Sequence, residues 1–253
     1  IANKLIDAAY ISGWQFVKLQ KRTPELCVPE SQKYKLRDTP WGTMPYIEYK
    51  NKLEFGKKEY DAIYKHCGDR IKCFASVWDI PSADFMSNYT DIAKIPSALI
   101  TNIELCKYTR NKFDTLIIST GMSTEQEINQ CITACRPDVI MHTNSTYPSP
   151  VDELNLSYIQ WLANKWKHCE VGYSGHEYGL VTTFAAAVLG AKWIERHVTL
   201  DRAMWGSDQL ASVEPQGMMK LAKGIRDIEN SLGTLGPRTL LKTENSKRES
   251  LRT

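Results

Sequence analysis

Short runs of apolar residues alternate with amphipathic stretches along the whole chain. Several of these runs are almost continuously apolar, which is typical of parallel strands that are covered on both faces. Seven runs predict strands, namely Gln15–Leu19, Lys72–Val77, Ile92–Ile95, Thr115–Ser119, Val139–His142, Glu170–Tyr173 and Lys192–His197.

The stretches between these runs place apolar residues at helical spacing. The stretch Asn3–Ser12 stops at Gly13, and glycine commonly ends helices. Ser123–Ala134 begins with a Ser/Thr cap followed by acidic residues, which favours a helix start. The same spacing predicts further helices over Leu154–Lys165, Tyr178–Leu189 and Pro215–Leu232.

Repeated strand–helix units without a change of composition predict an α/β fold with a parallel sheet. Such a sheet is either open and doubly wound or closed into a (β/α)8 TIM barrel. The glycine fingerprint and the Walker sequence of nucleotide-binding open sheets are both absent, so we predict the barrel, over residues 1–246. A barrel of this type needs about eight strands. We therefore expect its first strand to precede Ile1.

Two long connections stand out between the predicted elements. Residues 22–55 contain four prolines and predict an extended loop over the mouth of the barrel. Residues 201–213 are polar and long for a connector, which indicates a functional loop.

Composition and charge exclude several classes of protein. The formal charge of +3 and the pI of about 8.4 give little support for a nucleic-acid partner. No apolar run approaches the ~20 residues that cross a membrane, so no membrane span is predicted. Seven scattered cysteines without a C-x-x-C pair predict reduced, mostly buried thiols in a cytoplasmic protein.

Polar residues gather where the predicted strands end, the place from which barrel enzymes take their active-site side chains. Lys18 and Lys94 stand at two of these ends, and serines stand at several others. Lysine and hydroxyl groups suit a phosphate. His176 and His197 follow neighbouring strands and can bind one divalent ion, with water or substrate oxygens completing its coordination. The residues alone favour a phosphate-handling, metal-assisted barrel enzyme.

Each candidate residue also has a purely structural interpretation. A lone lysine such as Lys18 is often a solvated strand edge, and a single Ser-Thr-Gly turn is common at helix starts. We expect His66 and His168 at the surface, and His142 as a structural residue. Function is favoured by convergence, because six strand ends carry groups compatible with phosphate or metal.

Nine segments in fixed order and spacing carry a family resemblance: Phe16–Arg22, Tyr46–Tyr60 (YIEYKNKLEFGKKEY), Phe74–Asp79, Lys94–Asn102 (KIPSALITN), Ile118–Met122, His142–Pro150 (HTNSTYPSP), Gly172–Gly179 (GYSGHEYG), Ile194–Arg202 (IERHVTLDR) and Ser207–Pro215. Through them the chain resembles the sialic acid synthase family over essentially its whole length. The resemblance implies condensation of phosphoenolpyruvate (PEP) with an open-chain N-acetylated amino sugar, with N-acetylmannosamine as first choice. Water enters, phosphate leaves and N-acetylneuraminate (sialic acid) forms.

The resemblance also implies a cofactor, a partner and a set of site residues. The cofactor is a divalent metal, Mn²⁺ or Mg²⁺, and the full-length protein is expected to be a homodimer without nucleic-acid or membrane partners. Lys18, Lys94, His176 and His197 are the implied catalytic residues, and both histidines are the metal ligands. The implied substrate contacts are Ser97, Ser119, Ser145 and Ser174 for PEP, together with both lysines, and Gln20, Tyr147 and Asp208 for the sugar.

Three departures from the family pattern qualify these expectations. A catalytic glutamate of the family's first strand would precede Ile1. A second acid, expected two residues after Ser97, is replaced by Leu99. Residues 247–253 are interpreted as the start of a linker toward a C-terminal antifreeze-like domain. We therefore expect the 253-residue chain alone to turn over weakly or not at all, and the complete gene product to be an enzyme.

Alternative functions stay open at this point. A synthase of another nonulosonic acid, legionaminic or pseudaminic acid, shares the same barrel motifs. A degenerate barrel that binds metal and phosphate without catalysis is favoured by Leu99 and opposed by the intact histidines. A nicotinamide-dependent oxidoreductase lacks its glycine fingerprint.

Overall fold

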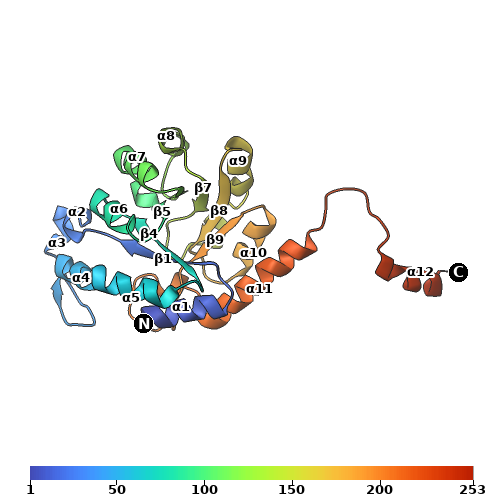
Figure 1. Cartoon of the computed structure of the whole chain (residues 1–253), viewed down its shortest axis with the longest axis horizontal. Helices are drawn as coiled ribbons and strands as arrows, with labels where there is room; N and C mark the ends of the chain where they lie inside the picture. The colour runs from blue at the N-terminus through green and yellow to red at the C-terminus, as the bar shows by residue number, and fades with distance from the viewer. Residues whose placement is uncertain (253) are drawn as a thin grey trace.

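Seven parallel strands form one curled sheet in the computed structural model, which describes residues 1–252 (Figure 1). They are β1 (Phe16–Lys21), β4 (Lys72–Val77), β5 (Ile92–Ile95), β6 (Thr115–Ser119), β7 (Val139–Thr143), β8 (Glu170–Gly175) and β9 (Trp193–Arg196), hydrogen-bonded in this order. Each pair of neighbours is parallel. All seven predicted strands are confirmed, with small differences at their ends.

Helices cover the outer face of this sheet (Figure 1). They are α1 (Ala2–Ile11), α5 (Lys57–Cys67), α6 (Ile80–Met86), α7 (Ile103–Lys112), α8 (Glu125–Cys135), α9 (Tyr158–Lys165), α10 (Val181–Val188) and α11 (Pro215–Ser231). Two predicted helices start later than expected. Asn155 and Gly179 have φ of 44° and 96°, and such left-handed residues cannot continue a right-handed helix.

Residues 22–55 are more ordered than predicted. Instead of one extended loop, they form α2 (Pro24–Cys27), α3 (Glu30–Lys33), the antiparallel pair β2 (Leu36–Arg37) and β3 (Met44–Pro45), and α4 (Tyr46–Leu53). The prediction missed α4 because this helix is rich in lysine and tyrosine and buries none of its residues, so it carries no apolar stripe.

The sheet curls until its two edge strands face each other. Strands β1 and β9 are not hydrogen-bonded to one another, yet their inward side chains meet. The rings of Phe16 and Trp193 have centroids 5.3 Å apart, and Lys18 Nζ lies 3.6 Å from Glu195 Oε1. The fold is therefore an α/β sheet resembling a TIM barrel, and among the described residues seven strands belong to this sheet. The eighth strand, expected before Ile1, stays a prediction.

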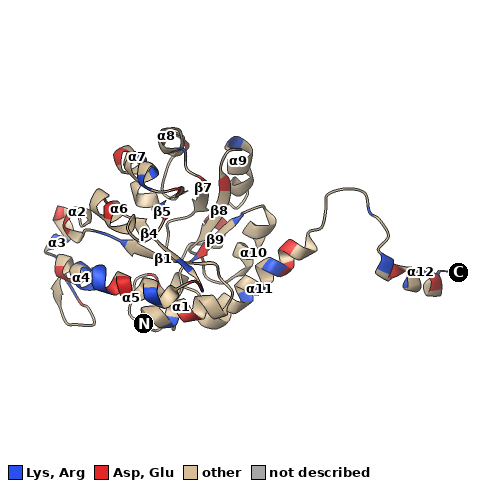
Figure 2. Cartoon of the chain, in the orientation of Figure 1, with Lys and Arg blue, Asp and Glu red and all other residues tan. Residues whose placement is uncertain are grey.

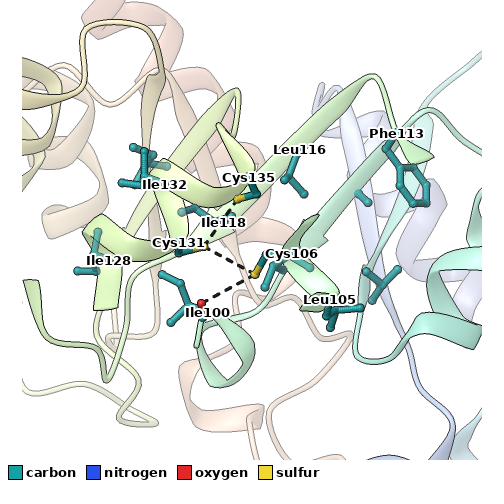
Figure 3. Close-up of a cluster of buried hydrophobic side chains, with 14 of the residues drawn as sticks. Ile100, Leu105, Cys106, Phe113, Leu116, Ile118, Ile128, Cys131, Ile132 and Cys135 are labelled. Carbon is teal, nitrogen blue, oxygen red and sulfur yellow. Dashed lines mark hydrogen bonds between the residues drawn. The ribbon is translucent and has the colours of Figure 1, made fainter. Parts of the chain in front are cut away.

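Three apolar clusters hold the fold together. The largest fills the space between the sheet and the outer helices. Figure 3 shows the part of it between α7 and α8, where Cys131 Sγ lies 3.7 Å from Cys106 Sγ and 3.8 Å from Cys135 Sγ. All seven cysteines are free thiols and five are buried, as predicted. A second cluster lies under α1, α5 and α11. A third fills the inside of the curl with Phe16, Phe74, Ile92, Ile117, Val139, Met141 and Trp193.

The C-terminal segment leaves the barrel after α11. A 3₁₀ turn (Lys242–Glu244) and α12 (Asn245–Leu251) stand apart from the sheet at the end of an extended stretch (Figure 1). The domain boundary at residue 246 stays a prediction. Basic and acidic residues are interspersed along α4, α5 and α11 (Figure 2). Within residues 1–252, no helix is long and apolar enough to span a membrane.

Candidate active site

A polar layer lies directly above the apolar interior of the curl. Because strand side chains alternate between faces, the residue two positions after an inward apolar residue also points inward. By this alternation Lys18 points to the same inner face as Phe16, and Glu195 points to the same inner face as Trp193. In the same way Ser76 points inward like Phe74, and Lys94 points inward like Ile92. The sheet thus brings charged residues from three strands into one interior.

Glu195 is the centre of this layer, and the sequence analysis did not select it. One oxygen, Oε1, accepts from Lys94 Nζ at 2.7 Å and from Ser174 Oγ at 3.1 Å, and lies 3.6 Å from Lys18 Nζ. Burial raises the pKa of this carboxyl, but the charges of Lys18 and Lys94 outweigh burial and hold the pKa below its ordinary value. Glu195 is therefore ionised, and two lysines facing one carboxylate leave one positive charge.

Lys94 is the more deeply placed of the two lysines, with only 3% of its surface exposed. Burial lowers the pKa of its ammonium group to about 8, although Glu195 opposes this shift. Lys18 is less buried and also donates to Ser76 Oγ at 3.0 Å. Both predicted lysines therefore reach the same interior.

Three predicted phosphate-binding serines lie at the ends of β5, β6 and β7. Ser97, in a 3₁₀ turn (Ser97–Leu99), accepts the Gly121 N–H at 3.1 Å. A Cβ atom at Gly121 would lie 2.2 Å from Ser145 Oγ and 2.9 Å from Ser97 Oγ, so only glycine allows these hydroxyls to converge. Ser119 Oγ is buried without a partner among the described residues, as expected of a group that awaits a ligand or water oxygen.

The two predicted metal ligands lie side by side at the ends of β8 and β9. The rings of His176 and His197 have centroids 5.2 Å apart. His176 Nδ1 lies 2.5 Å from the Asn144 carbonyl oxygen, which only accepts, so Nδ1 carries the proton and Nε2 keeps its lone pair. Burial lowers the pKa of His176 to about 4, and burial together with the Lys18 charge lowers that of His197. Both rings are neutral at neutral pH.

These two histidines have the donor chemistry that a divalent ion needs. A neutral ring fixed through Nδ1 by a carbonyl is a common arrangement of metal-bound histidine. Asp208 Oδ2 lies 3.7 Å from His197 Nδ1, which is near enough for an electrostatic interaction but longer than a hydrogen bond. Among residues 1–252, no group of three or more His, Cys, Asp or Glu side chains is arranged to hold a metal. An ion here would take its other ligands from water or substrate.

Two of the three predicted sugar contacts belong to the histidine group. The Tyr147 ring lies on His176 with centroids 4.1 Å apart and meets His197 edge-on at 5.6 Å. Burial and the Asp208 charge raise the pKa of Tyr147 to about 12, so its hydroxyl stays protonated. Gln20 stands apart from this group, and its side-chain oxygen accepts from Arg22.

Two cavities flank the polar interior. One, of about 780 Å³, lies over the ends of β1, β4 and β5, with Arg22, Trp78 and Leu99 in a mostly apolar wall. The other, of about 770 Å³, lies between the loops after β6 and β7 and includes Asn144 and Ser145. Of the predicted site residues, Ser145 lines the second cavity, whereas the described lining of the first cavity includes none of them.

The structure adds residues that the sequence analysis missed. Glu195 shares its strand face with His197, two positions later, and an acid on the inner face of a buried strand was the available signal. The ion pair between Glu177 and Arg196 connects the neighbours of both histidines. No signal in the sequence indicated that these two residues would meet. Two other histidines match expectation: His142 is buried and bonded to the Leu154 carbonyl, and His168 is exposed. His66, expected at the surface, is half-buried, and its Nε2 lies 2.8 Å from Asp7 Oδ1.

A curled parallel α/β sheet with lysines, serines and paired histidines at its strand ends places the candidate site where TIM-barrel enzymes carry their active sites. The chain belongs to the NeuB family, whose model matches residues 5–236. It is 33% identical to N-acetylneuraminate-9-phosphate synthase of Drosophila melanogaster, over 98% of this chain and 69% of the relative. It is 34% identical to N,N'-diacetyllegionaminic acid synthase of Campylobacter jejuni, over 92% of this chain and 73% of the relative.

A solved structure agrees with these relatives. The N-acetylneuraminic acid synthetase of Leptospira borgpetersenii, crystallised in complex with citrate, superposes with a TM-score of 0.85 at 28% identity. The match covers 99% of this chain and 86% of that protein. The predicted family is therefore confirmed, and its relatives are synthases of sialic acid and related nonulosonic acids.

Proposed function

We propose that this protein condenses PEP with the open-chain aldehyde of an N-acetylated amino sugar, N-acetylmannosamine being the first candidate. A bond forms between C3 of PEP and the aldehyde carbon, water adds at C2, and phosphate leaves to give N-acetylneuraminate. The observation that supports this most is that the Lys18–Lys94–Glu195 cluster lies next to the two neutral histidines.

The lysine and serine groups suit PEP. Lys18 and Lys94 supply positive charge for its phosphate and carboxylate, and the hydroxyls of Ser97, Ser119 and Ser145 supply directional donors. Because Glu195 neutralises one of the two lysine charges, positive charge alone does not make the interior bind any anion. A ligand must also accept hydrogen bonds from the serine hydroxyls. This arrangement holds PEP in one orientation before the aldehyde arrives.

We propose that the acceptor sugar binds at the rim, between the histidines and the cavity over β1, β4 and β5. Tyr147 and Asp208 lie against the histidine rings, and Gln20 borders that cavity through Arg22. A sugar bound there would present its aldehyde between the two histidines and PEP. The apolar wall around Leu99 suits the methyl groups of an acylated sugar.

His176 and His197 are the residues that would hold Mn²⁺ or Mg²⁺. When bound, such an ion supplies Lewis-acid polarisation of the aldehyde oxygen. The chain's own part is to keep both rings neutral and to fix the tautomer of His176 through the Asn144 carbonyl. We further propose that the complete protein is a cytoplasmic homodimer.

The acceptor itself is the least determined part of the proposal. Relatives of similar identity are named for N-acetylneuraminate-9-phosphate and for N,N'-diacetyllegionaminic acid. Phosphorylated, unphosphorylated and diacetamido sugars therefore all belong in the test.

The test is phosphate release from PEP with Mn²⁺ and a panel of these amino sugars. It is run with the 253-residue chain and with the complete gene product that carries this sequence. From the complete gene product we expect release that depends on one sugar and is abolished by His176→Ala, and from the 253-residue chain alone we expect weak release or none. The matched control is His168→Ala, since His168 is exposed and remote from the strand ends.

A folded protein that binds PEP and Mn²⁺ but releases no phosphate with any sugar would overturn the synthase proposal. That outcome would favour the degenerate, non-catalytic barrel. Release with a diacetamido sugar alone would keep the reaction and change the product to a legionaminic or pseudaminic acid.

A further inference from the structure

A buried ion pair lies directly beside the two histidines. Glu177 follows His176 in the sequence, and Arg196 precedes His197. Arg196 Nη1 lies 3.1 Å from Glu177 Oε1, and the two side chains are 2% and 0% exposed. Strand pairing sets Gly175 opposite Arg196, so the pair connects β8 and β9 at the level where the histidines begin.

Almost every polar group of this pair is engaged. Arg196 also donates from Nη1 to the Gly179 carbonyl at 2.9 Å and from Nη2 to the Glu177 carbonyl at 2.6 Å. Glu177 Oε2 accepts from Tyr173 at 2.9 Å, and its Oε1 accepts from Thr183 Oγ1 at 2.8 Å. Thr183 Oγ1 in turn accepts from Arg196 at 2.8 Å. The guanidinium therefore holds the backbone from Glu177 to Gly179, directly after His176.

The pair also packs tightly against the strand that carries His176. A Cβ atom at Gly175 would lie 2.6 Å from Glu177 Oε2 and 3.0 Å from Arg196 Cδ. The residue before His176 therefore has no room for a side chain. We therefore expect displacement of the ion pair to shift the backbone that positions the His176 ring.

Stability alone is a poor explanation for such a pair. Removing two charges from water costs about as much as their attraction returns, and apolar replacements of the same shape are often neutral or stabilising. What a buried pair with this many hydrogen bonds supplies is a single geometry. Here that geometry is the position of the end of β8 relative to the end of β9.

We infer that the Glu177–Arg196 pair is a positioning device, which sets the spacing and orientation of His176 and His197 for a divalent cation. This inference rests on the proposed function, in which the two histidines hold the ion. Glu177 and Arg196 do not contact the cation. They act through the backbone that joins each of them to a histidine.

The decisive measurement is Mn²⁺ affinity by titration calorimetry, alongside the melting temperature of each variant. Glu177→Gln keeps the shape of the side chain and removes its charge. We expect its Mn²⁺ affinity to fall about 10- to 100-fold, the effect of losing residues that orient metal ligands. PEP affinity measured without metal is expected to change less than about twofold, because the lysine and serine groups do not contact the pair.

A double variant separates positioning from stability. Glu177→Leu with Arg196→Met replaces both charges by apolar groups, so we expect its melting temperature to recover toward that of the wild type. Its Mn²⁺ affinity should stay low, because the bonds to Gly179 and to the Glu177 carbonyl are gone. Thr183→Val is a milder variant that removes one hydroxyl shared by both charges, and it should give a smaller loss of Mn²⁺ affinity.

The matched control is Arg110→Met, which breaks an ion pair with Asp138 between α7 and the start of β7. It should leave Mn²⁺ affinity unchanged. Wild-type Mn²⁺ affinity in folded Glu177→Gln and in the double variant would reduce the pair to a structural contact, as would failure of all three variants to fold. Absence of Mn²⁺ binding by the wild type would also overturn the inference, whereas Mn²⁺ binding without phosphate release would count against the proposed function alone.

Discussion

The two sides of the barrel mouth are built differently. Where β8 and β9 end, the His176 ring is bonded to a carbonyl, and Glu177 and Arg196 are buried against each other, with Arg196 Nε as the one polar side-chain atom of this pair that lacks a partner among the described residues. Over β1, β4 and β5 the mouth opens into a cavity of about 780 Å³ with a largely apolar wall. There, Arg22 Nε and Trp78 Nε1 are buried without a partner among the described residues.

This difference divides the work of the site. Chemistry that depends on ligand geometry needs side chains fixed by their neighbours, and the β8–β9 side provides them. Choice among acceptor sugars needs a surface that can vary, and segments between strands vary more readily than strands do. The excursion of residues 22–55 closes the variable side. We therefore expect substitutions on the two sides of the mouth to change different kinetic parameters.

The largest expected effect comes from Lys94→Met. It removes the buried ammonium that would face PEP and leaves Glu195 without its closest partner, 2.7 Å away. Unpairing a buried charge costs about 3–5 kcal/mol of folding stability, and loss of one charged donor lowers phosphate release about 100- to 1000-fold. An assay of phosphate release measures the effect on the rate, and thermal unfolding measures the effect on stability. Lys57→Met, on the outer helix α5, is the control and should change neither.

A near-wild-type rate of phosphate release in Lys94→Met would show that the polar interior takes no part in the reaction. A lowered melting temperature with an unchanged rate would do the same, because it would make Lys94 a partner of Glu195 and nothing more.

The pH dependence of PEP binding is the next test of the interior. Lys94 is charged below its pKa of about 8 and neutral above it, since burial lowers that pKa. PEP affinity is therefore full on the acid side and falls as the pH rises through 8, about tenfold between pH 7 and pH 9. The second ionisation of phosphate esters, near about pH 6, lies outside this window. Affinity that stays constant from pH 7 to pH 9 would contradict the role of Lys94.

Gly121→Ala tests whether the serine hydroxyls must converge. The new Cβ would lie 2.2 Å from Ser145 Oγ, so the loop after β6 or β7 has to move. Overpacking of this kind costs about 1–3 kcal/mol, and we expect the KM for PEP to rise about 5- to 10-fold with the acceptor KM unchanged. Gly236→Ala is the control, because nothing lies within 4 Å of its Cβ position. An unchanged KM for PEP would exclude the Gly121 loop from the phosphate site.

Much of the fold was predictable because its strands are short, apolar and parallel. Runs such as Thr115–Ser119 match observed strands to the residue, since a strand covered on both faces leaves a continuous apolar signal. The excursion of residues 22–55 was not predictable in detail. The helix α4 buries none of its residues, and its position depends on tertiary contacts rather than on its own periodicity.

The site was predicted in its parts but not in its connections. Lysines, serines and histidines were identifiable because each stands at a strand end. That Lys18 and Lys94 share one carboxylate depends on the curl that brings β9 opposite β1, which no local pattern encodes. The same holds for Glu177 and Arg196, since their contact depends on the register of β8 against β9.

The smallest expected effect, and the sharpest test of the comparison, is Leu99→Ala. Leu99 lies in the wall of the cavity over β1, β4 and β5, and it replaces an acid expected from the family pattern. Its truncation enlarges the cavity without touching the lysines or the histidines. We expect the KM of the acceptor sugar to change about two- to fivefold, an effect of up to about 1 kcal/mol, with the KM for PEP and Mn²⁺ affinity unchanged.

The direction of the Leu99→Ala effect distinguishes two functions for the cavity. If the wall receives an acyl group of the sugar, a bulkier N-propanoyl analogue gains relative to the N-acetyl sugar in the variant, because the space opened by truncation accepts the extra methylene. Leu53→Ala, on the exposed part of α4, should not change this ratio. A shift in the KM for PEP with no shift in the sugar ratio would place the cavity on the PEP side. The division between a fixed and a variable side of the mouth would then be wrong.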